Sequence, residues 1–171
     1  MEFLRALYNS FKLEILDLSQ NYFYGAISDD IHRISRLREL NLEGHNFIGT
    51  IPNDFGKLRN MTSLALFLNQ LSREILDNIG RLLRLINLKL FNNNFSGSLR
   101  PKLGRYSLLE EFQVSTNKLT GGDLPERLAW NLSRLDMNKN RFSGKIPHGV
   151  SSLRNLLVLK ARNNLFKGMI H

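Results

Sequence analysis

The stretch LSRLDMNKNRFSGKIP, residues 132–147, decides the fold because its spacing returns along the whole chain. Written as LxxLxLxxNxFxGxIP, the same frame fits seven successive segments, with apolar residues throughout the leucine columns. The copies start at Leu13, Leu37, Met61, Leu85, Leu109, Leu132 and Leu156. Consecutive starts are 24, 24, 24, 24, 23 and 24 residues apart. A period this regular predicts a repeat architecture in which each copy forms one coil of a stack.

Each copy predicts one short strand, because the apolar residues of an LxL segment point to the same side of an extended chain. One such strand cannot bury its apolar face alone, so a neighbouring coil must cover it. We expect a partial repeat at residues 1–12, followed by one solenoid domain over residues 13–171. Seven coils exceed the roughly three repeats that a stable stack needs.

The asparagine column marks the point where each predicted strand ends and the chain turns inward. A side-chain amide both donates and accepts hydrogen bonds, so it can satisfy backbone groups that lack a sheet partner. His45 interrupts the column, and we expect it to be the weakest rung, with its ring nitrogens as substitutes. Two residues later, a column of phenylalanine and leucine is expected to fill the far side of the core. The predicted ladder is Asn21, His45, Asn69, Asn93, Asn117, Asn140 and Asn164.

A glycine column follows, and it suits a turn that requires positive φ. The third copy has Arg73 in place of glycine and Leu76 in place of proline, so we expect a locally distorted turn there. The fifth copy has one extra residue before Pro125 and then ends early, which predicts an irregular junction. The six glycines are Gly25, Gly49, Gly97, Gly121, Gly144 and Gly168.

Charge is distributed unevenly along the chain, whose formal net charge is +9. Residues 1–85 contain 10 basic and 10 acidic residues, whereas residues 86–171 contain 14 and 5. This asymmetry suggests an anionic partner near the later coils, with a solvated basic surface as the alternative. Nucleic acid is not expected, because the basic residues lie on both faces and lack interleaved aromatic residues.

Targeting and capping signals are sparse. No apolar run approaches the ~20 residues of a membrane span, and MEFLRALYNSFK lacks the apolar centre of a signal peptide. The absence of cysteine excludes disulfide caps. Because a solenoid needs polar caps over its terminal coils, we expect this sequence to be a fragment or a trimmed descendant of a longer protein.

Catalysis is not predicted, and no residue is assigned a catalytic, cofactor-binding or metal-binding role. The tripeptide Asp54-Phe55-Gly56 matches a kinase magnesium-binding motif, but the glycine-rich loop and the HRD loop that give it meaning are missing. The four histidines fall at unrelated positions of the frame, without an HExxH motif or a carboxylate cluster. Every recurring position in the frame has a structural reason.

Four stretches carry a family resemblance: LEILDLSQNYF, LKLFNNNFSGSL, LGRYSLLEEFQVSTNKLTG and WNLSRLDMNKNRFSGKIP. They resemble the plant-specific class of leucine-rich repeats, and more closely the ectodomains of HAESA-like receptor kinases, which sense secreted peptide hormones. The resemblance implies an α/β solenoid, a right-handed leucine-rich repeat superhelix with a concave parallel β-sheet and an extra short strand from each LxGxIP half. It also implies an extracellular or cell-surface location and a co-receptor as a candidate second partner.

The candidate binding residues alternate with the buried leucines of each strand and therefore face the concave side. Their chemistry is graded, with acidic residues in the first coils, two phenylalanines in the middle and basic residues at the end. Exposed aromatic residues are common binding anchors, although these two could simply pack on each other. The candidates are Glu39, Glu43, Phe67, Lys89, Phe91, Gln113, Arg134, Asn138, Lys160 and Arg162.

The sequence Lys160-Ala161-Arg162 presents two cations on one face of a strand. HAESA-like receptors and their relatives commonly hold a peptide carboxylate with an RxR pair, so the resemblance implies that this KxR pair is a carboxylate clamp. Lysine offers only a point charge where arginine could make two hydrogen bonds. Three N-x-S/T sequons predict glycosylation at Asn60, Asn94 and Asn131.

Taken together, these patterns predict a non-catalytic extracellular recognition module of a plant receptor-like kinase, binding a secreted peptide or protein for signalling or defence. The segment itself is not expected to contact a membrane. The alternative is a secreted inhibitor of a cell-wall-degrading enzyme, resembling the polygalacturonase-inhibiting proteins, although those carry cysteine caps. A degraded gene product with no ligand is the third interpretation.

Overall fold

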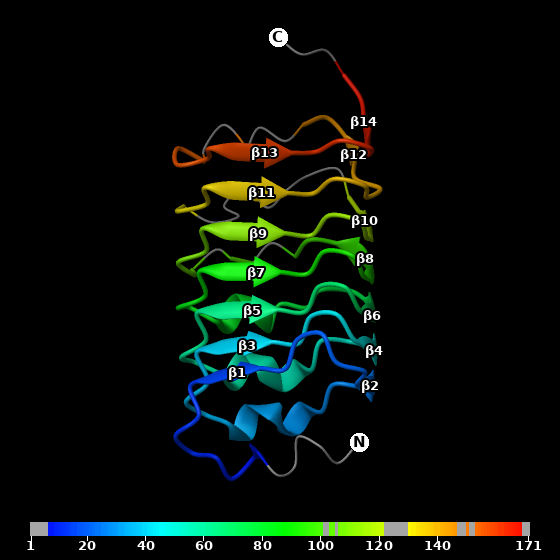
Figure 1. Ribbon diagram of the computed structural model, residues 1–171. Helices are drawn as coiled ribbons and strands as arrows, with labels where there is room; N and C mark the ends of the chain where they lie inside the picture. Colours follow the sequence, from blue (N-terminus) through cyan, green and yellow to red (C-terminus); the bar gives the residue numbers. More distant parts are fainter. Residues whose placement is uncertain are drawn as a thin grey trace.

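The repeated frame forms a stack of coils in which each LxL segment adds one strand to a main sheet (Figure 1). The computed structural model describes residues 7–100, 103–104, 106–121, 130–146, 150 and 153–168. The main sheet is parallel and orders its strands β1-β3-β5-β7-β9-β11-β13. These seven strands are β1 (Ile15–Asp17), β3 (Glu39–Asn41), β5 (Ser63–Ala65), β7 (Asn87–Lys89), β9 (Glu111–Gln113), β11 (Arg134–Asp136) and β13 (Val158–Lys160).

The register of the main sheet reproduces the sequence period. Equivalent residues pair directly, so that Leu40 of β3 lies beside Leu64 of β5. The same 24-residue offset holds at every step except between β9 and β11, where Glu111 pairs with Arg134. The shorter repeat is therefore absorbed outside the strands, in the segment that joins these two coils.

A second parallel sheet runs down one side of the stack, and its strands come from the NxFxGxI half of the frame (Figure 1). Here the pairing is staggered, because Tyr24 lies beside Asn46, 22 rather than 24 residues later. Backbone hydrogen bonds from Arg141 to Leu119 and from Ser143 to Gly121 continue the contact across the irregular junction. The strands are β2 (Tyr24–Ala26), β4 (Asn46–Gly49), β6 (Gln70–Arg73), β8 (Asn94–Ser98), β10 (Lys118–Thr120), and the separate pair β12 (Ser143–Gly144) and β14 (Leu165–Phe166).

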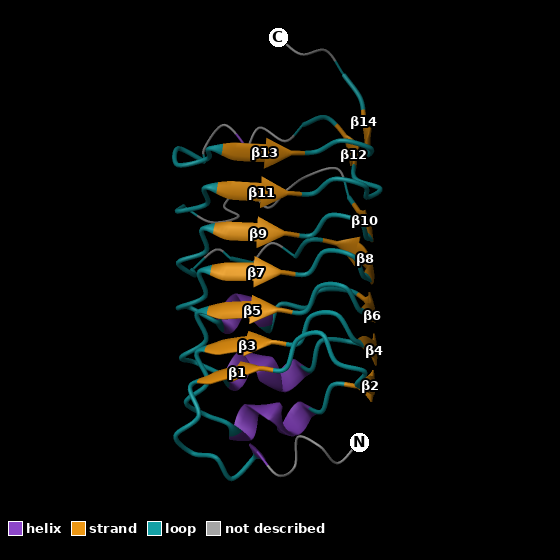
Figure 2. Ribbon diagram, viewed as in Figure 1, coloured by secondary structure: helices purple, strands orange, loops and turns teal. Residues whose placement is uncertain are grey.

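The convex side of the early coils carries short 3₁₀ helices rather than α-helices (Figure 2). Within the described residues these are η2 (Asp29–Arg33), η3 (Asn53–Lys57) and η4 (Ile79–Arg81). The Ser28 hydroxyl caps η2 by accepting a hydrogen bond from the Asp30 N–H. No helix in the described part of the chain combines the length and the apolar character that crossing a membrane would require.

One continuous hydrophobic core fills the space between the two sheets and the convex turns. The frame leucines and the phenylalanine column are nearly inaccessible in the interior coils, as Leu64, Phe47 and Phe95 illustrate with 0% exposure. At the two ends of the stack, Phe23 and Phe166 are only partly buried. The core therefore depends on each coil covering the next.

The asparagine column forms a hydrogen-bonded ladder along this core. Asn69 is typical: its Nδ2 donates to the carbonyls of Leu42, Leu66 and Phe67 at 2.8–3.2 Å, and its Oδ1 accepts from the Phe47 N–H at 3.0 Å. The same four bonds recur at Asn93, Asn117, Asn140 and Asn164. In every case the inter-coil bonds join the asparagine to the coil that precedes it.

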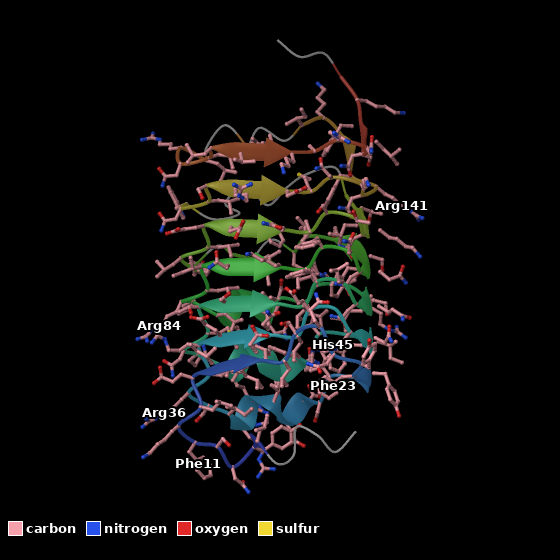
Figure 3. The ribbon with its side chains drawn as sticks, viewed as in Figure 1. Phe11, Phe23, Arg36, His45, Arg84 and Arg141 are labelled. Carbon is pink, nitrogen blue, oxygen red and sulfur yellow. The ribbon has the colours of Figure 1, made fainter. Side chains whose placement is uncertain are left out.

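His45 breaks this pattern. Its Nδ1 donates to the Asn21 carbonyl at 2.6 Å, whereas its buried Nε2 has no hydrogen-bond partner. The ring lies between Phe23 and Phe47, with centroids 5.1 and 5.2 Å away (Figure 3 labels His45 and Phe23). One ring nitrogen thus replaces part of an asparagine's bonding, and the aromatic contacts fill the remaining space.

All six glycines of the turn column have positive φ, from 74° at Gly97 to 124° at Gly168. The third copy was expected to be distorted, but β6 keeps the 22-residue stagger on both of its sides. Arg73 instead adopts φ of 65°, so a non-glycine residue takes the strained conformation and the strand pairing is preserved. The third copy differs from its neighbours in the 3₁₀ helix that follows the turn, because η4 has three residues whereas η2 and η3 have five.

Several sequence predictions lie outside the described residues. They include residues 1–6 of the partial repeat and the junction segment 122–129. Tyr8, within the same partial repeat, is described and is 4% exposed, so it joins the hydrophobic core.

Candidate ligand-binding face

The concave face consists of the side chains that flank the buried middle residue of each main-sheet strand. The burial patterns show this alternation directly: in β7, Leu88 is fully buried while Asn87 and Lys89 are partly exposed. The residue two positions after each strand continues the same side. All ten candidate binding residues lie in these three columns, in coils two to seven.

The centre of this face is an aromatic pair. The rings of Phe67 and Phe91, from neighbouring coils, stack with centroids 4.2 Å apart and an interplanar angle of 18°. Each ring is partly buried, because each covers one side of the other. The sequence left open whether these residues bind a ligand or pack on each other, and the structure shows that they pack together while keeping an exposed surface.

Beside the aromatic pair lies a paired charge cluster built around Glu111. Its carboxylate lies 3.2 Å from the Lys89 amine and 3.3 Å from the Arg134 guanidinium. Gln113 donates a 2.6 Å hydrogen bond to the same carboxylate. Because one carboxylate lies between two cations, this cluster keeps a net charge of +1, and its contacts hold the side chains in place.

The first coils carry the acidic end of the face. Glu43 accepts a 3.1 Å hydrogen bond from the Gln20 amide, and Glu39 is exposed. Hydrogen bonds from the Ser19 hydroxyl and backbone N–H, together with one from the Asn41 amide, lower the pKa of Asp17 below its ordinary value. The Asp17 carboxylate is therefore ionised at neutral pH.

The last coils carry the basic end, and the two cations of the predicted clamp differ. The Lys160 amine lies 3.9 Å from the Asp136 carboxylate, so its charge is partly compensated. Arg162 is exposed and forms no ion pair with any residue the structure describes. Asn138 supports this strand by accepting a 2.7 Å hydrogen bond from the Arg162 backbone N–H.

The three sequons differ in accessibility. Asn94 and Asn131 are exposed, whereas Asn60 is partly buried. The Asn60 Oδ1 accepts a hydrogen bond from the Arg84 guanidinium at 3.3 Å. The side chains of Asn94 and Asn131 are thus the more accessible acceptors for a glycan.

The kinase-like tripeptide has a structural explanation in η3. Asp54 pairs with the Lys57 amine at 2.7 Å, and this contact lowers the pKa of Asp54. Gly56 is buried, and a Cβ there would lie 2.8 Å from the Asn78 carbonyl oxygen. The described residues include no cluster of His, Cys, Asp or Glu that could hold a metal ion, and of the histidines, His148 and His171 lie outside them.

The sequence prediction missed two features. The residue before each ladder position adopts a left-handed backbone conformation, with φ of 51–70° from Gln20 to Asn163, although the residue type varies from coil to coil. The other feature is a groove at the edge where the main-sheet strands begin, here called the edge groove. The sequence signal for this groove is a row of polar residues at the same position in three successive repeats, namely Arg36, Asn60 and Arg84.

The sequence and the structure place this chain among leucine-rich repeat solenoids. The Leucine Rich Repeat family matches at residues 12–34, 36–58 and 131–153. No curated protein matches the sequence.

Among solved structures, the chain is similar to plant receptor ectodomains. The plant peptide hormone receptor RGFR1, solved in complex with RGF2, is 33% identical with a TM-score of 0.87, covering 94% of this chain and 26% of the receptor. The Arabidopsis receptor kinase HAESA, in complex with the peptide hormone IDA and the co-receptor SERK1, is 30% identical with a TM-score of 0.81, covering 91% of this chain and 30% of that protein. A plant ice-binding protein is 27% identical with a TM-score of 0.81, over 90% of this chain and 50% of its own length.

The repeat frame therefore forms the leucine-rich repeat solenoid that the sequence predicted, and this solenoid is similar to those of plant receptor ectodomains. The chain spans about a quarter to a third of the two receptor structures. The fold is shared with a protein that binds ice, so the fold does not by itself define the ligand.

Proposed function

We propose that this chain is a non-catalytic extracellular recognition module that binds a secreted peptide or protein ligand along its concave face. The observation that carries the proposal is the partly exposed Phe67–Phe91 stack, with Arg162 further along the same face and free of any described acidic partner. The similarity to peptide hormone receptors supports this class of ligand.

The spacing of these groups defines the ligand. Phe91 and Arg162 occupy the same column three coils apart, which corresponds to about 14 Å at ~4.8 Å per coil. An extended peptide rises about 3.3 Å per residue, so about four residues span this distance. The ligand we expect places an apolar side chain on the aromatic stack and a carboxylate, such as a free C-terminus, at Arg162.

Charge gives the ligand its direction. A peptide carboxylate is repelled by Glu39 and Glu43 at one end and attracted by Lys160 and Arg162 at the other. A guanidinium can hold a carboxylate through two parallel hydrogen bonds, whereas Lys160 is already engaged with Asp136. Arg162 is therefore the principal carboxylate-binding residue, and Lys160 adds electrostatic attraction.

The cluster around Glu111 has a positioning role in this proposal. The Glu111 carboxylate offsets one of the two positive charges of Lys89 and Arg134, so the cluster adds less attraction for a ligand carboxylate than two unpaired cations would. Gln113 and Asn138 are available to hydrogen-bond a peptide backbone between the two anchors. A co-receptor would then contact the module and its peptide together, and glycans at Asn94 and Asn131 would lie outside the concave face.

The test is a binding screen of the purified chain against secreted-type peptides, each offered with a free carboxylate and as the C-terminal amide. Isothermal titration calorimetry then compares the wild type with Phe91→Ala and Arg162→Ala. The controls are Tyr22→Ala and Arg141→Gln, an aromatic and a basic residue that are exposed away from the concave columns.

Phe91→Ala is expected to weaken binding of both peptide forms, by about tenfold or more for a central aromatic anchor. Arg162→Ala is expected to weaken the free acid and leave the amide unchanged. If neither variant binds peptide more weakly than its control variant, the concave-face proposal fails. Salt-sensitive binding to a polygalacturonase in place of any peptide would instead identify the chain as an enzyme inhibitor.

A further inference from the structure

The edge groove lies outside the concave face, along the side of the stack where the main-sheet strands begin. It has a volume of about 370 Å³. Figure 3 shows Arg36 and Arg84 projecting from this side, opposite to Arg141. The groove is lined by Glu14, Arg36, Arg38, Asn60, Thr62 and Arg84.

The lining is periodic because the coils are. Arg36, Asn60 and Arg84 are 24 residues apart and hold equivalent positions in three successive coils, and Lys12 holds the same position in the coil before them. Equivalent backbone positions in neighbouring coils lie about 4.8 Å apart, so the two arginines are about 10 Å apart with an amide between them. The row runs along the axis of the solenoid.

The charge of the groove is positive and largely uncompensated. Arg38 lies 3.4 Å from the Glu14 carboxylate, which pairs those two residues. Arg84 donates to the Asn60 Oδ1, a neutral partner, and neither Arg36 nor Arg84 forms an ion pair with a described residue. This positive row stands within residues 1–85, whose net charge is zero.

The chemistry of the lining identifies the class of ligand. Arginine binds carboxylate and sulfate groups through paired hydrogen bonds, and the Asn60 amide and Thr62 hydroxyl suit a ligand rich in hydroxyl groups. No lining residue is apolar or aromatic, which disfavours a lipid, a stacked nucleic-acid base or an apolar peptide anchor. We propose that the edge groove binds an anionic polysaccharide, with its acidic groups on Arg36 and Arg84 and sugar hydroxyls on Asn60 and Thr62.

The test uses the whole 171-residue chain, produced without glycosylation, and two charge-matched double variants. R36Q/R84Q removes the two free cations of the groove, whereas R141Q/K118Q removes two exposed cations elsewhere on the solenoid. Binding to polygalacturonate, dextran sulfate and neutral dextran is measured by biolayer interferometry at fixed ionic strength. Circular dichroism verifies that all variants fold alike, and R36K/R84K tests whether charge alone is sufficient.

We expect R36Q/R84Q to weaken polyanion binding at least tenfold, R141Q/K118Q to change it less than twofold, and neutral dextran not to bind. Polygalacturonate and dextran sulfate distinguish a carboxylate-bearing from a sulfate-bearing ligand. Equal losses in the two double variants would overturn the proposal, because they would reflect net charge alone. Equal R36Q/R84Q sensitivity toward single-stranded DNA, or a glycan on Asn60 in protein from a secreting plant host, would also overturn it.

This site is independent of the concave-face proposal. Phe91→Ala is expected to leave polyanion binding unchanged, and R36Q/R84Q is expected to leave peptide binding unchanged. Failure of one proposal therefore leaves the other standing.

Discussion

Replacement of His45 by asparagine is expected to stabilise the protein by completing the ladder. The histidine forms one inter-coil hydrogen bond and buries an Nε2 that has no partner, with only 5% of the residue exposed. Asparagines at equivalent positions make two inter-coil bonds and two within their own coil, as at Asn69. The substitution thus exchanges an unsatisfied site for a regular rung.

The magnitude follows from a few competing contributions. Removing a buried unpaired polar atom is worth about 1–3 kcal/mol, and one additional inter-coil hydrogen bond contributes about 1 kcal/mol. Against this, the ring contacts with Phe23 and Phe47 are lost, at about 0.5–1.5 kcal/mol each. The expected net effect of His45→Asn is a stabilisation of about 1 kcal/mol.

Urea unfolding followed by far-ultraviolet circular dichroism measures this difference. His45→Ala, which removes the hydrogen bond and the ring together, is expected to be clearly destabilised. The reciprocal change Asn69→His is expected to cost stability, since it places the irregular rung in the middle of the stack. The reasoning is refuted if His45→Asn is destabilising by 1 kcal/mol or more, because aromatic packing would then outweigh the hydrogen bonding of the ladder.

Two further substitutions and one titration test the backbone conformation and the charges. Thr116→Asn is expected to stabilise the protein by about 0.5–1 kcal/mol in urea unfolding, because asparagine tolerates positive φ better than a β-branched residue. The φ angle of Thr116 is 54°. An unchanged unfolding midpoint would contradict this expectation. Gly97→Ala is expected to be more destabilising than Gly49→Ala in the same assay, although both glycines have positive φ. Only at Gly97 would an added Cβ lie 2.7 Å from a side-chain carbon of the adjacent coil, the Cγ of Glu74. Equal losses of stability in the two variants would exclude the clash. NMR titration is expected to place the Asp17 pKa below 3.8, chiefly because of the hydrogen bonds from Ser19. The contribution of Asp17 to stability is then complete above pH 3.8 and is lost as the pH falls through the lowered pKa. A measured pKa at or above 3.8 would disprove this.

Much of the fold was readable from the sequence because both sheets derive from residues that recur in every repeat. Leucine pairs define the main strands, and the FxG positions define the second sheet. The left-handed position before each asparagine was not readable, because residues as different as Leu68 and Thr116 occupy it. There the backbone conformation is imposed by the coil on either side and not by local preference.

The candidate site was predictable in outline only. Alternation along the strands indicated which side chains share the concave face, but not that Glu111 pairs with both Lys89 and Arg134. Such pairs depend on side-chain rotamers and on neighbours one coil away. Arg162 could be recognised as lacking an acidic partner only after the partner of Lys160 was known.

The asparagine ladder has a direction. Each rung from Asn69 to Asn164 makes its inter-coil bonds only to the coil before it, through bonds such as those of Asn93 to Leu66 and Leu71. When the chain emerges from the ribosome amino end first, every new asparagine meets a coil that has already been synthesised. Each coil can therefore lock into place during translation without waiting for the residues that follow it, and translation order and assembly order coincide.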